Sequence, residues 1–80
     1  MKIRVLGSGC ARCKKLEDRI RQIVAKHQLD VEIEKVTDLQ EIMKYGIMMT
    51  PGLVIDDEFK SVGVVPKDLF LLQWLRKEPS

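Results

Sequence analysis

Hydrophobic and polar residues alternate over two short stretches in the first half of the chain, with a helical pattern between them. Residues 2–6 and 30–36 show the alternation that is typical of β-strands with one buried face. From Ala11 the apolar positions follow a helical period, which predicts a helix of roughly four turns that ends near His27 and Gln28. The residues expected on one side of this helix are Leu16, Ile20, Ile23, Val24 and His27.

A shorter helix is predicted after the second strand. Asp38 is expected to be its N-cap and to accept a hydrogen bond from the backbone N–H of Glu41, while the Glu41 side chain reaches back. Gly46 suits the end of this helix because glycine tolerates the left-handed conformation found there. The buried side is expected to consist of Leu39, Ile42 and Met43.

The last third of the chain predicts a strand hairpin and a final helix. Residues 53–55 form a short apolar strand, and residues 59–63 form its returning strand after a polar turn. Pro66 fits the first position of the last helix, which continues over residues 67–76.

The predicted order is strand, helix, strand, helix, strand, strand, helix. The helix between the first two strands makes them parallel, and the hairpin makes the last two antiparallel. This order predicts an α/β fold with a four-stranded mixed sheet flanked by three helices. A chain of 80 residues buries only about 60% of its unfolded surface, so we expect residues 1–80 to form a single small domain.

Composition and charge argue against several functional classes. Hydrophobic residues make up 45% of the chain and charged residues 32%, which is typical of a folded rather than a disordered protein. A net charge of +2 is too small to indicate nucleic-acid binding. No apolar run approaches the roughly 18 residues of a membrane span, and no signal peptide is recognisable, so we expect a cytoplasmic protein without membrane contact.

The only two cysteines, Cys10 and Cys13, lie at the predicted start of the first helix. Residues three apart share a helix face, so their sulfurs can meet. The helix N-terminus and the nearby Arg12, Lys14 and Lys15 favour a thiolate at Cys10, since such surroundings lower a cysteine pKa from about 8.5 to between about 3.5 and 7.5. Cys10 is therefore the expected nucleophile, and Cys13 is the expected resolving thiol.

Other uses of the cysteine pair must be weighed. Two inert thiols are disfavoured, because both cysteines fall at a redox spacing on a strand-to-helix turn. A tetrahedral zinc site needs four ligands, and the single histidine, His27, lies roughly 20 Å along the helix. Copper(I) needs only two thiolates, so a copper(I)-binding, metallochaperone-like protein stays open as the alternative.

Cys10-Ala11-Arg12-Cys13 after a strand, followed by Thr50-Pro51 before a strand hairpin, resembles the thioredoxin superfamily. More narrowly, the chain is similar to the short, glutaredoxin-sized thioredoxin-like proteins of archaea and bacteria, often named small redox-active disulfide proteins. The resemblance extends from Met1 to about Leu75. It implies a thioredoxin-like fold and a protein-disulfide oxidoreductase that needs no cofactor or metal besides the Cys10–Cys13 disulfide. Its partners are then protein disulfides and a reductase, although a glutaredoxin-like activity with glutathione is also open.

The resemblance also implies roles for residues outside the cysteine motif. The Thr50–Pro51 peptide should be cis and packed against the disulfide, with the backbone of Thr50 pairing with the substrate chain and the ring of Pro51 keeping metals away. We expect Arg12 to contact substrate as well. The chain departs from ordinary thioredoxins in lacking a carboxylate on the first strand, which carries Lys2 and Arg4, so the usual proton relay to Cys13 is not expected.

Two surface features admit two interpretations each. The first helix is rich in basic residues, which either steer an acidic partner or form an ordinary solvated face: Arg12, Lys14, Lys15, Arg19, Arg21 and Lys26. In the last helix, Leu69, Leu72 and Leu75 suffice for the core. A second stripe of Phe70, Leu71 and Trp74 is then either covered within a monomer, the expected state, or the contact of a weak dimer.

Overall fold

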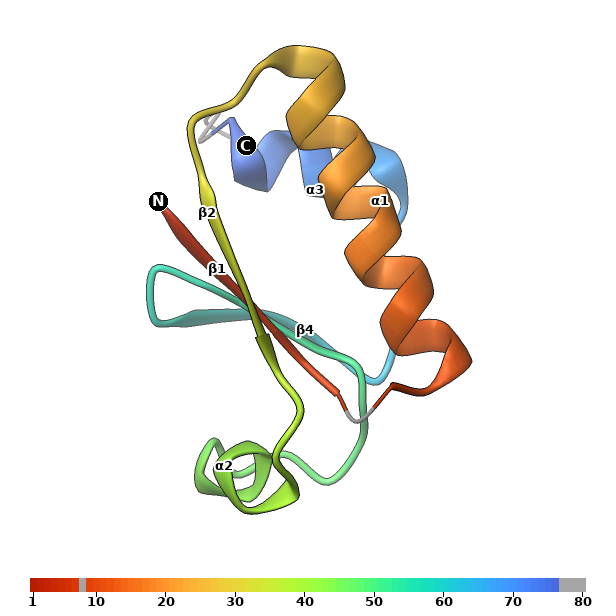
Figure 1. Cartoon of the computed structure of the whole chain (residues 1–80), viewed down its shortest axis with the longest axis vertical. Coiled ribbons are helices and arrows are strands. Elements are labelled where there is room, and N and C mark those ends of the chain that lie inside the picture. Colours follow the sequence, from red (N-terminus) through yellow and green to blue (C-terminus); the bar gives the residue numbers. More distant parts are fainter. Residues whose placement is uncertain (8, 77–80) are drawn as a thin grey trace.

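Within residues 1–7 and 9–76, four strands and three helices follow one another in the predicted order (Figure 1). The structure is a computed structural model, and it describes residues 1–7 and 9–76. The elements are β1 (Lys2–Leu6), α1 (Ala11–His27), β2 (Glu32–Val36), α2 (Leu39–Lys44), β3 (Gly52–Ile55), β4 (Glu58–Val62) and α3 (Asp68–Leu75). The predicted α/β, thioredoxin-like architecture is thereby confirmed. A single domain over residues 1–80 stays a prediction, because residues 77–80 lie outside the described part.

The sheet has the strand order β2-β1-β3-β4. β1 is parallel to β2 and antiparallel to β3, and β3 is antiparallel to β4, as the pattern predicted. In this register Leu6, at the end of β1, lies opposite Gly52, at the start of β3. The segment that follows β1 and the segment that precedes β3 therefore meet at the same edge of the sheet, although about forty residues separate them in sequence.

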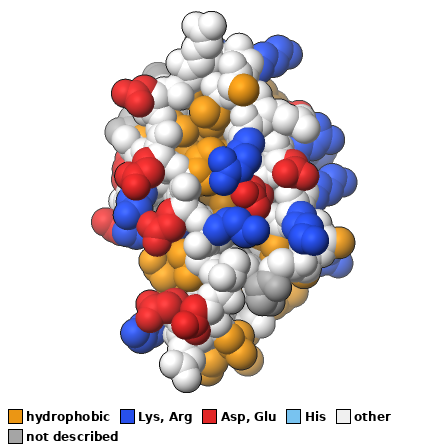
Figure 2. Space-filling model, in the orientation of Figure 1, with side chains coloured by type: hydrophobic (Ala, Val, Ile, Leu, Met, Phe, Trp, Pro, Cys, Tyr) orange, Lys and Arg blue, Asp and Glu red, His pale blue; other side chains and the backbone are white. Residues whose placement is uncertain are grey.

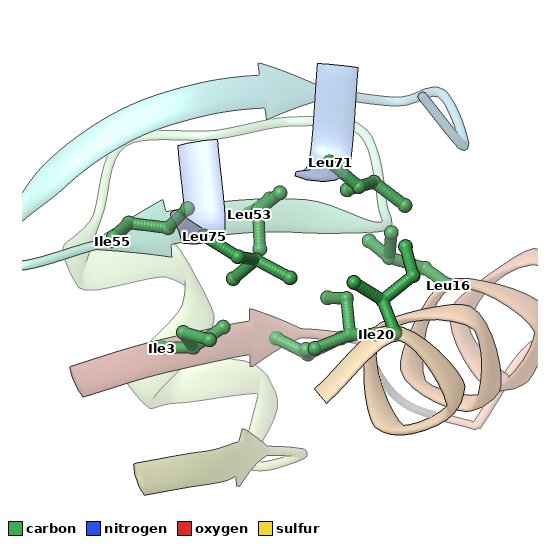
Figure 3. Packing of buried hydrophobic residues seen from close by; sticks show 9 residues of the cluster. Ile3, Leu16, Ile20, Leu53, Ile55, Leu71 and Leu75 are labelled. Carbon is green, nitrogen blue, oxygen red and sulfur yellow. The ribbon is translucent and has the colours of Figure 1, made fainter. Parts of the chain in front are cut away.

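The main core lies between the sheet and the pair of helices α1 and α3 (Figure 1). Figure 3 shows Leu16 and Ile20 of α1 pointing toward the strands, while Leu71 and Leu75 enter from α3. Burying one such side chain contributes about 1.5–3 kcal/mol. The fully or nearly fully buried members of this cluster are Ile3, Val5, Leu16, Ile20, Ile23, Leu53, Ile55, Leu71 and Leu75. This packing fixes the start of α1 against the end of β1.

α2 covers the opposite face of the sheet with a much smaller cluster. Ile42 is 2% exposed and packs with Leu6 and Val54, because alternate residues of β1 face opposite sides of the sheet. The prediction that Leu39 and Met43 share this burial is wrong, since they are 64% and 63% exposed. In this helix of only six residues, Ile42 is the residue whose side chain is buried against the sheet.

The N-cap of α2 is also different in detail from the predicted capping box. Asp38 accepts from the backbone N–H of Gln40 at 2.8 Å rather than from that of Glu41. The Glu41 carboxylate instead accepts from Lys44 Nζ at 3.0 Å. The cap residue was predicted correctly, and the reciprocal bond was wrong.

The start and the buried face of α3 differ from the prediction. The helix begins at Asp68 with Lys67 as N-cap, so Pro66 lies outside it. Leu71 is fully buried, whereas Leu69 is 64% exposed, which reverses the predicted roles of these two leucines. The sequence of α3 is apolar nearly all round, so the contact with α1 rather than the pattern selects its buried face.

Smaller differences concern the ends of the strands and the tail of α1. β2 begins at Glu32 rather than at residue 30, and β4 covers 58–62 rather than 59–63. His27 is exposed at the end of α1, while Val24 is half-buried.

Within residues 1–7 and 9–76, no helix combines the length and the apolar character that a membrane span requires.

Candidate active site

The two cysteines form a disulfide at the N-terminus of α1, and only one of them faces solvent. Cys10 is the N-cap, with extended backbone angles, and it is exposed. Cys13 lies in the first helical turn and is 5% exposed, with a Cα–Cα distance of 5.1 Å to Cys10. The backbone N–H of Cys13 donates to Cys10 Sγ at 3.2 Å. An incoming group can therefore approach Cys10, while Cys13 lies behind it.

Gly7 makes room for the buried sulfur, a role that the sequence analysis missed. A Cβ atom on Gly7 would overlap with Cys13 Sγ and lie 2.9 Å from Cys13 Cβ. Gly7 is itself buried, and its N–H donates to the carbonyl of Val36 at 2.9 Å, which extends the pairing of β1 with β2. A glycine immediately after a strand and before the cysteine motif was the available signal, but it was interpreted only as part of a turn.

The segment before β3 brings Thr50 and Pro51 to the disulfide. The Thr50–Pro51 peptide is cis, as the resemblance implied. Thr50 Oγ1 lies 4.0 Å from Cys10 Sγ, and Pro51 is buried beside it. The carbonyl of Pro51 accepts from the N–H of Gly63 at 2.8 Å, so the loop after β4 is attached to the same site.

Arg12 lies between the cysteines and reaches the loop after β4. Its Nη1 donates to the carbonyl of Gly63 at 3.4 Å, in a partly buried position. Gly63 has a φ of +78°, and a Cβ there would lie 3.2 Å from Met49 Cβ. The sequence analysis singled out Arg12 but missed Gly63 and Met49, because their closeness depends on how the loops meet.

An exposed apolar rim continues from these loops. Met48 is 98% exposed, and Met49, Val64 and Val62 are 59%, 54% and 42% exposed. All four flank Thr50 or Gly63 in the chain, and the hydrogen bond between Gly63 and Pro51 joins the segments that carry them. The sequence analysis did not select these side chains, because three of them are isolated apolar residues in loops, which carry no pattern, and Val62 ends a strand.

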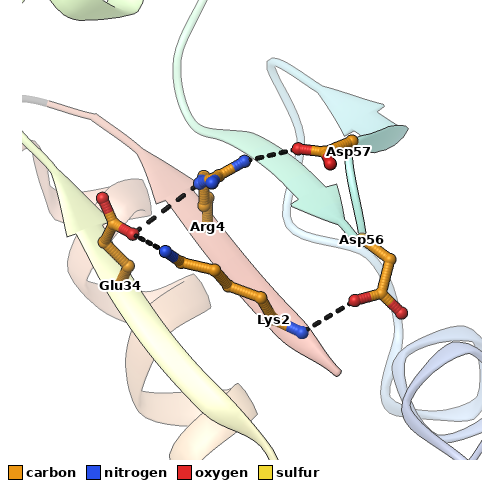
Figure 4. A network of polar contacts seen from close by, with 5 residues as sticks. All are labelled: Lys2, Arg4, Glu34, Asp56 and Asp57. Carbon is orange, nitrogen blue, oxygen red and sulfur yellow. Dashed lines mark hydrogen bonds and ion pairs between the residues drawn. The ribbon is translucent and has the colours of Figure 1, made fainter.

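The first strand holds its basic residues in an ion-pair network on the face away from α1 (Figure 4). Lys2 Nζ and Arg4 Nε lie 2.9 and 3.7 Å from the Glu34 carboxylate, and Arg4 also contacts Asp57 at 2.7 Å. The backbone N–H of Lys2 donates to Asp56 at 2.8 Å. The hydrogen bond from Lys2 lowers the pKa of the Glu34 carboxyl. The contacts of Arg4 therefore join β1 to β2 and to the turn after β3, and they do not involve the cysteines.

Within the described part of the chain, no buried carboxylate is available to take up a cysteine proton. Among residues 1–7 and 9–76, no charged residue is buried. The same part of the chain contains no cluster of three or more His, Cys, Asp or Glu residues that could hold a metal ion. The reactive features that the structure places at the site are the two sulfurs and the N-terminus of α1.

A disulfide with one exposed and one buried sulfur, placed at a helix N-terminus beside a cis-proline, defines a dithiol–disulfide exchange site on a thioredoxin-like sheet. The model of the thioredoxin domain family matches residues 1–76, and the chain belongs to that family. It is a thiol–disulfide oxidoreductase, and the copper(I) alternative is not favoured.

Two similar proteins are both named thioredoxin. The one from Methanothermobacter thermautotrophicus is 40% identical over 65 residues, which cover 81% of this chain and 84% of the relative. The one from Methanocaldococcus jannaschii is 36% identical over 64 residues, covering 80% and 73% of the two chains.

Proposed function

We propose that Cys10 is the nucleophile that reduces disulfides in partner proteins and that Cys13 is the resolving thiol. The observation that carries this assignment is the difference in exposure, because Cys10 faces solvent and Cys13 is 5% exposed. The N-cap position adds to it, since the N–H of Cys13 and the helix end stabilise negative charge on Cys10 Sγ.

The reaction has two exchange steps. The Cys10 thiolate attacks one sulfur of the substrate disulfide, so a mixed disulfide forms and the other substrate sulfur leaves as a thiolate. Cys13 loses its proton to solvent or to that leaving thiolate, because no buried carboxylate stands beside it among the described residues. Its sulfur then attacks Cys10 Sγ and releases the second substrate sulfur as a thiolate. Two electrons pass to the substrate, whose two thiolates take up protons from Cys13 and from solvent, and Cys10 and Cys13 end as the disulfide.

Three further residues are proposed to hold the substrate during this exchange. The backbone of Thr50 pairs with the substrate chain. The buried ring of Pro51 keeps metal ions away from the two cysteine sulfurs. Arg12 contributes a positive charge next to Cys10 and stabilises the loop after β4 through Gly63. The contact of 4.0 Å between Thr50 Oγ1 and Cys10 Sγ supports this grouping.

Relatives named thioredoxin imply protein disulfides as substrates and a reductase that returns the pair to the dithiol form. We further propose a cytoplasmic, cofactor-free single domain that acts as a monomer. A weak dimer through α3 would now involve Phe70 and Trp74, whose rings lie 6.1 Å apart, but not the buried Leu71. Sedimentation velocity over a range of concentrations distinguishes the two states.

The test uses the two serine variants, Cys10→Ser and Cys13→Ser, with a disulfide-containing protein such as insulin as substrate. Cys10→Ser should lose exchange activity, whereas Cys13→Ser should accumulate a mixed disulfide that is visible by mass on a nonreducing gel. If Cys13→Ser forms no adduct while Cys10→Ser does, the two roles are reversed. Reduction at the wild-type rate by either variant would refute the two-step scheme.

A further inference from the structure

The basic residues at the start of α1 are concentrated on one flank of the helix. Arg12, Lys15 and Arg19 follow one another at spacings of three and four residues, so they lie along one side of the helix. All three are exposed. The first helical turn contains no acidic residue that would offset them.

The opposite flank of α1 carries a carboxylate that offsets its basic residues. The carboxylate of Glu17 contacts Arg21 at 2.9 Å and Lys35 at 3.4 Å, while Lys14 on the same side has no ion-pair partner among the described residues. On the first flank, Arg12 and Lys15 have no ion-pair partner among residues 1–7 and 9–76.

The flank with Arg12, Lys15 and Arg19 borders a groove formed with the segment before α3. The groove has a volume of about 340 Å³, and Lys15, Arg19, Lys67 and Asp68 provide its charged lining. Asp68 lies 3.4 Å from Arg19, so it offsets one positive charge. With Arg12, the flank and the groove carry an excess of three positive charges, although the whole chain has a net charge of only +2. In Figure 2, several Lys and Arg side chains are visible along the side of the molecule where α1 runs.

Resting on the proposed function, we propose that this basic flank, defined by Arg12, Lys15, Arg19 and Lys67, binds an acidic polypeptide segment next to the target disulfide of a partner protein. Charge complementarity selects this occupant, because three of the four charged residues that line the groove are cationic. Position supports it, since Arg12 stands between the two cysteines and also contacts the Gly63 carbonyl. From Cys10 to Arg19 the helix rises about 13 Å, which an extended segment of about four residues spans.

The experiment compares two synthetic peptides that contain the same disulfide ring and differ only in a tail of about four residues, Glu in one and Gln in the other. Stopped-flow measurements give the rate constant for reduction of each peptide by the dithiol protein. The test variant is Lys15→Gln with Lys67→Gln. The matched control, Lys14→Gln with Lys26→Gln, removes the same charge, since Lys14 lies on the other flank and Lys26 lies about 16 Å along the helix from Lys15.

We expect the wild-type protein to reduce the Glu peptide about tenfold faster than the Gln peptide at low ionic strength. That ratio should fall toward one at about 0.5 M salt, where the screening length is only a few ångströms. The ratio of the two rate constants should drop about threefold in the test variant and stay nearly unchanged in the control variant.

Equal rates for the two peptides would overturn the inference, and so would an equal loss in the test and control variants, because general charge would then explain the effect. Both results leave the exchange reaction itself intact. A dithiol protein that reduces neither peptide contradicts the proposed function and, with it, this inference.

Discussion

Gly7 provides a sharp test of how the fold accommodates the buried sulfur. Replacing it with alanine adds one methyl group at a position where Cys13 Sγ and Cys13 Cβ already occupy the space. Neither partner can move freely. Gly7 donates to Val36 at the end of the paired strands, and Cys13 is fixed in the first turn of α1.

Two effects of opposite sign decide the outcome of Gly7→Ala. Where alanine fits, replacing glycine stabilises a protein by about 0.4–1 kcal/mol, because the unfolded chain loses freedom. Overpacking a filled core costs about 1–3 kcal/mol. The contact distances favour the second effect, so we expect a net loss of about 1–2 kcal/mol. For a domain of 80 residues this lowers Tm by roughly 4–8 °C per kcal/mol.

Urea unfolding of the reduced protein measures this loss, with the slope of the transition checked for constancy. A double-mutant cycle with Cys13→Ala then assigns its cause. Without the sulfur, Gly7→Ala should cost about 1 kcal/mol less, although the contact with the Cβ atom of residue 13 remains. Gly9→Ala is the matched control. Gly9 has a φ of +88° and no neighbour within 4 Å, so its cost should not change with residue 13.

The reasoning is refuted if Gly7→Ala is as stable as the wild type or more stable. It is also refuted if the cost is the same with and without the Cys13 sulfur. In the latter case the loss would come from the backbone of residue 7 rather than from the space that Cys13 needs.

Two other predictions concern stability. Arg21 and Lys35 hold the pKa of Glu17 below its ordinary value of 4.5. The ionised carboxylate therefore contributes fully to the free energy of unfolding above pH 4.5, and this contribution is lost as the pH falls through the lowered pKa. Glu17→Gln should cost about 1 kcal/mol at pH 7 and less at acid pH, as measured by urea unfolding. An equal cost at both pH values would contradict this. Leu71→Ala should cost about 2–5 kcal/mol, while Leu69→Ala should stay within about 0.5 kcal/mol, and similar losses for the two would contradict the observed burial of α3.

The sequence alone determined the elements and the chemistry, because both depend on local features. Alternation over β1 and the helical period over α1 predicted these elements at their observed bounds. The cysteine spacing was enough to indicate a redox pair, since residues three apart meet on any helix. The polarity of the helix supplied the expected order of roles, with Cys10 outside and Cys13 inside.

The tertiary structure decided which faces are buried and which distant segments meet. α3 is apolar on both sides, so only its packing on α1 and the sheet selects Leu71 over Leu69. Gly7 matters because α1 brings the Cys13 sulfur back over the end of β1. The contact of Arg12 with Gly63 depends on the antiparallel order of β1, β3 and β4, which places the three loops at one edge. No local pattern encodes the contacts of Cys10 with Thr50 and of Arg12 with Gly63, because their partners are 40 and 51 residues apart in the chain.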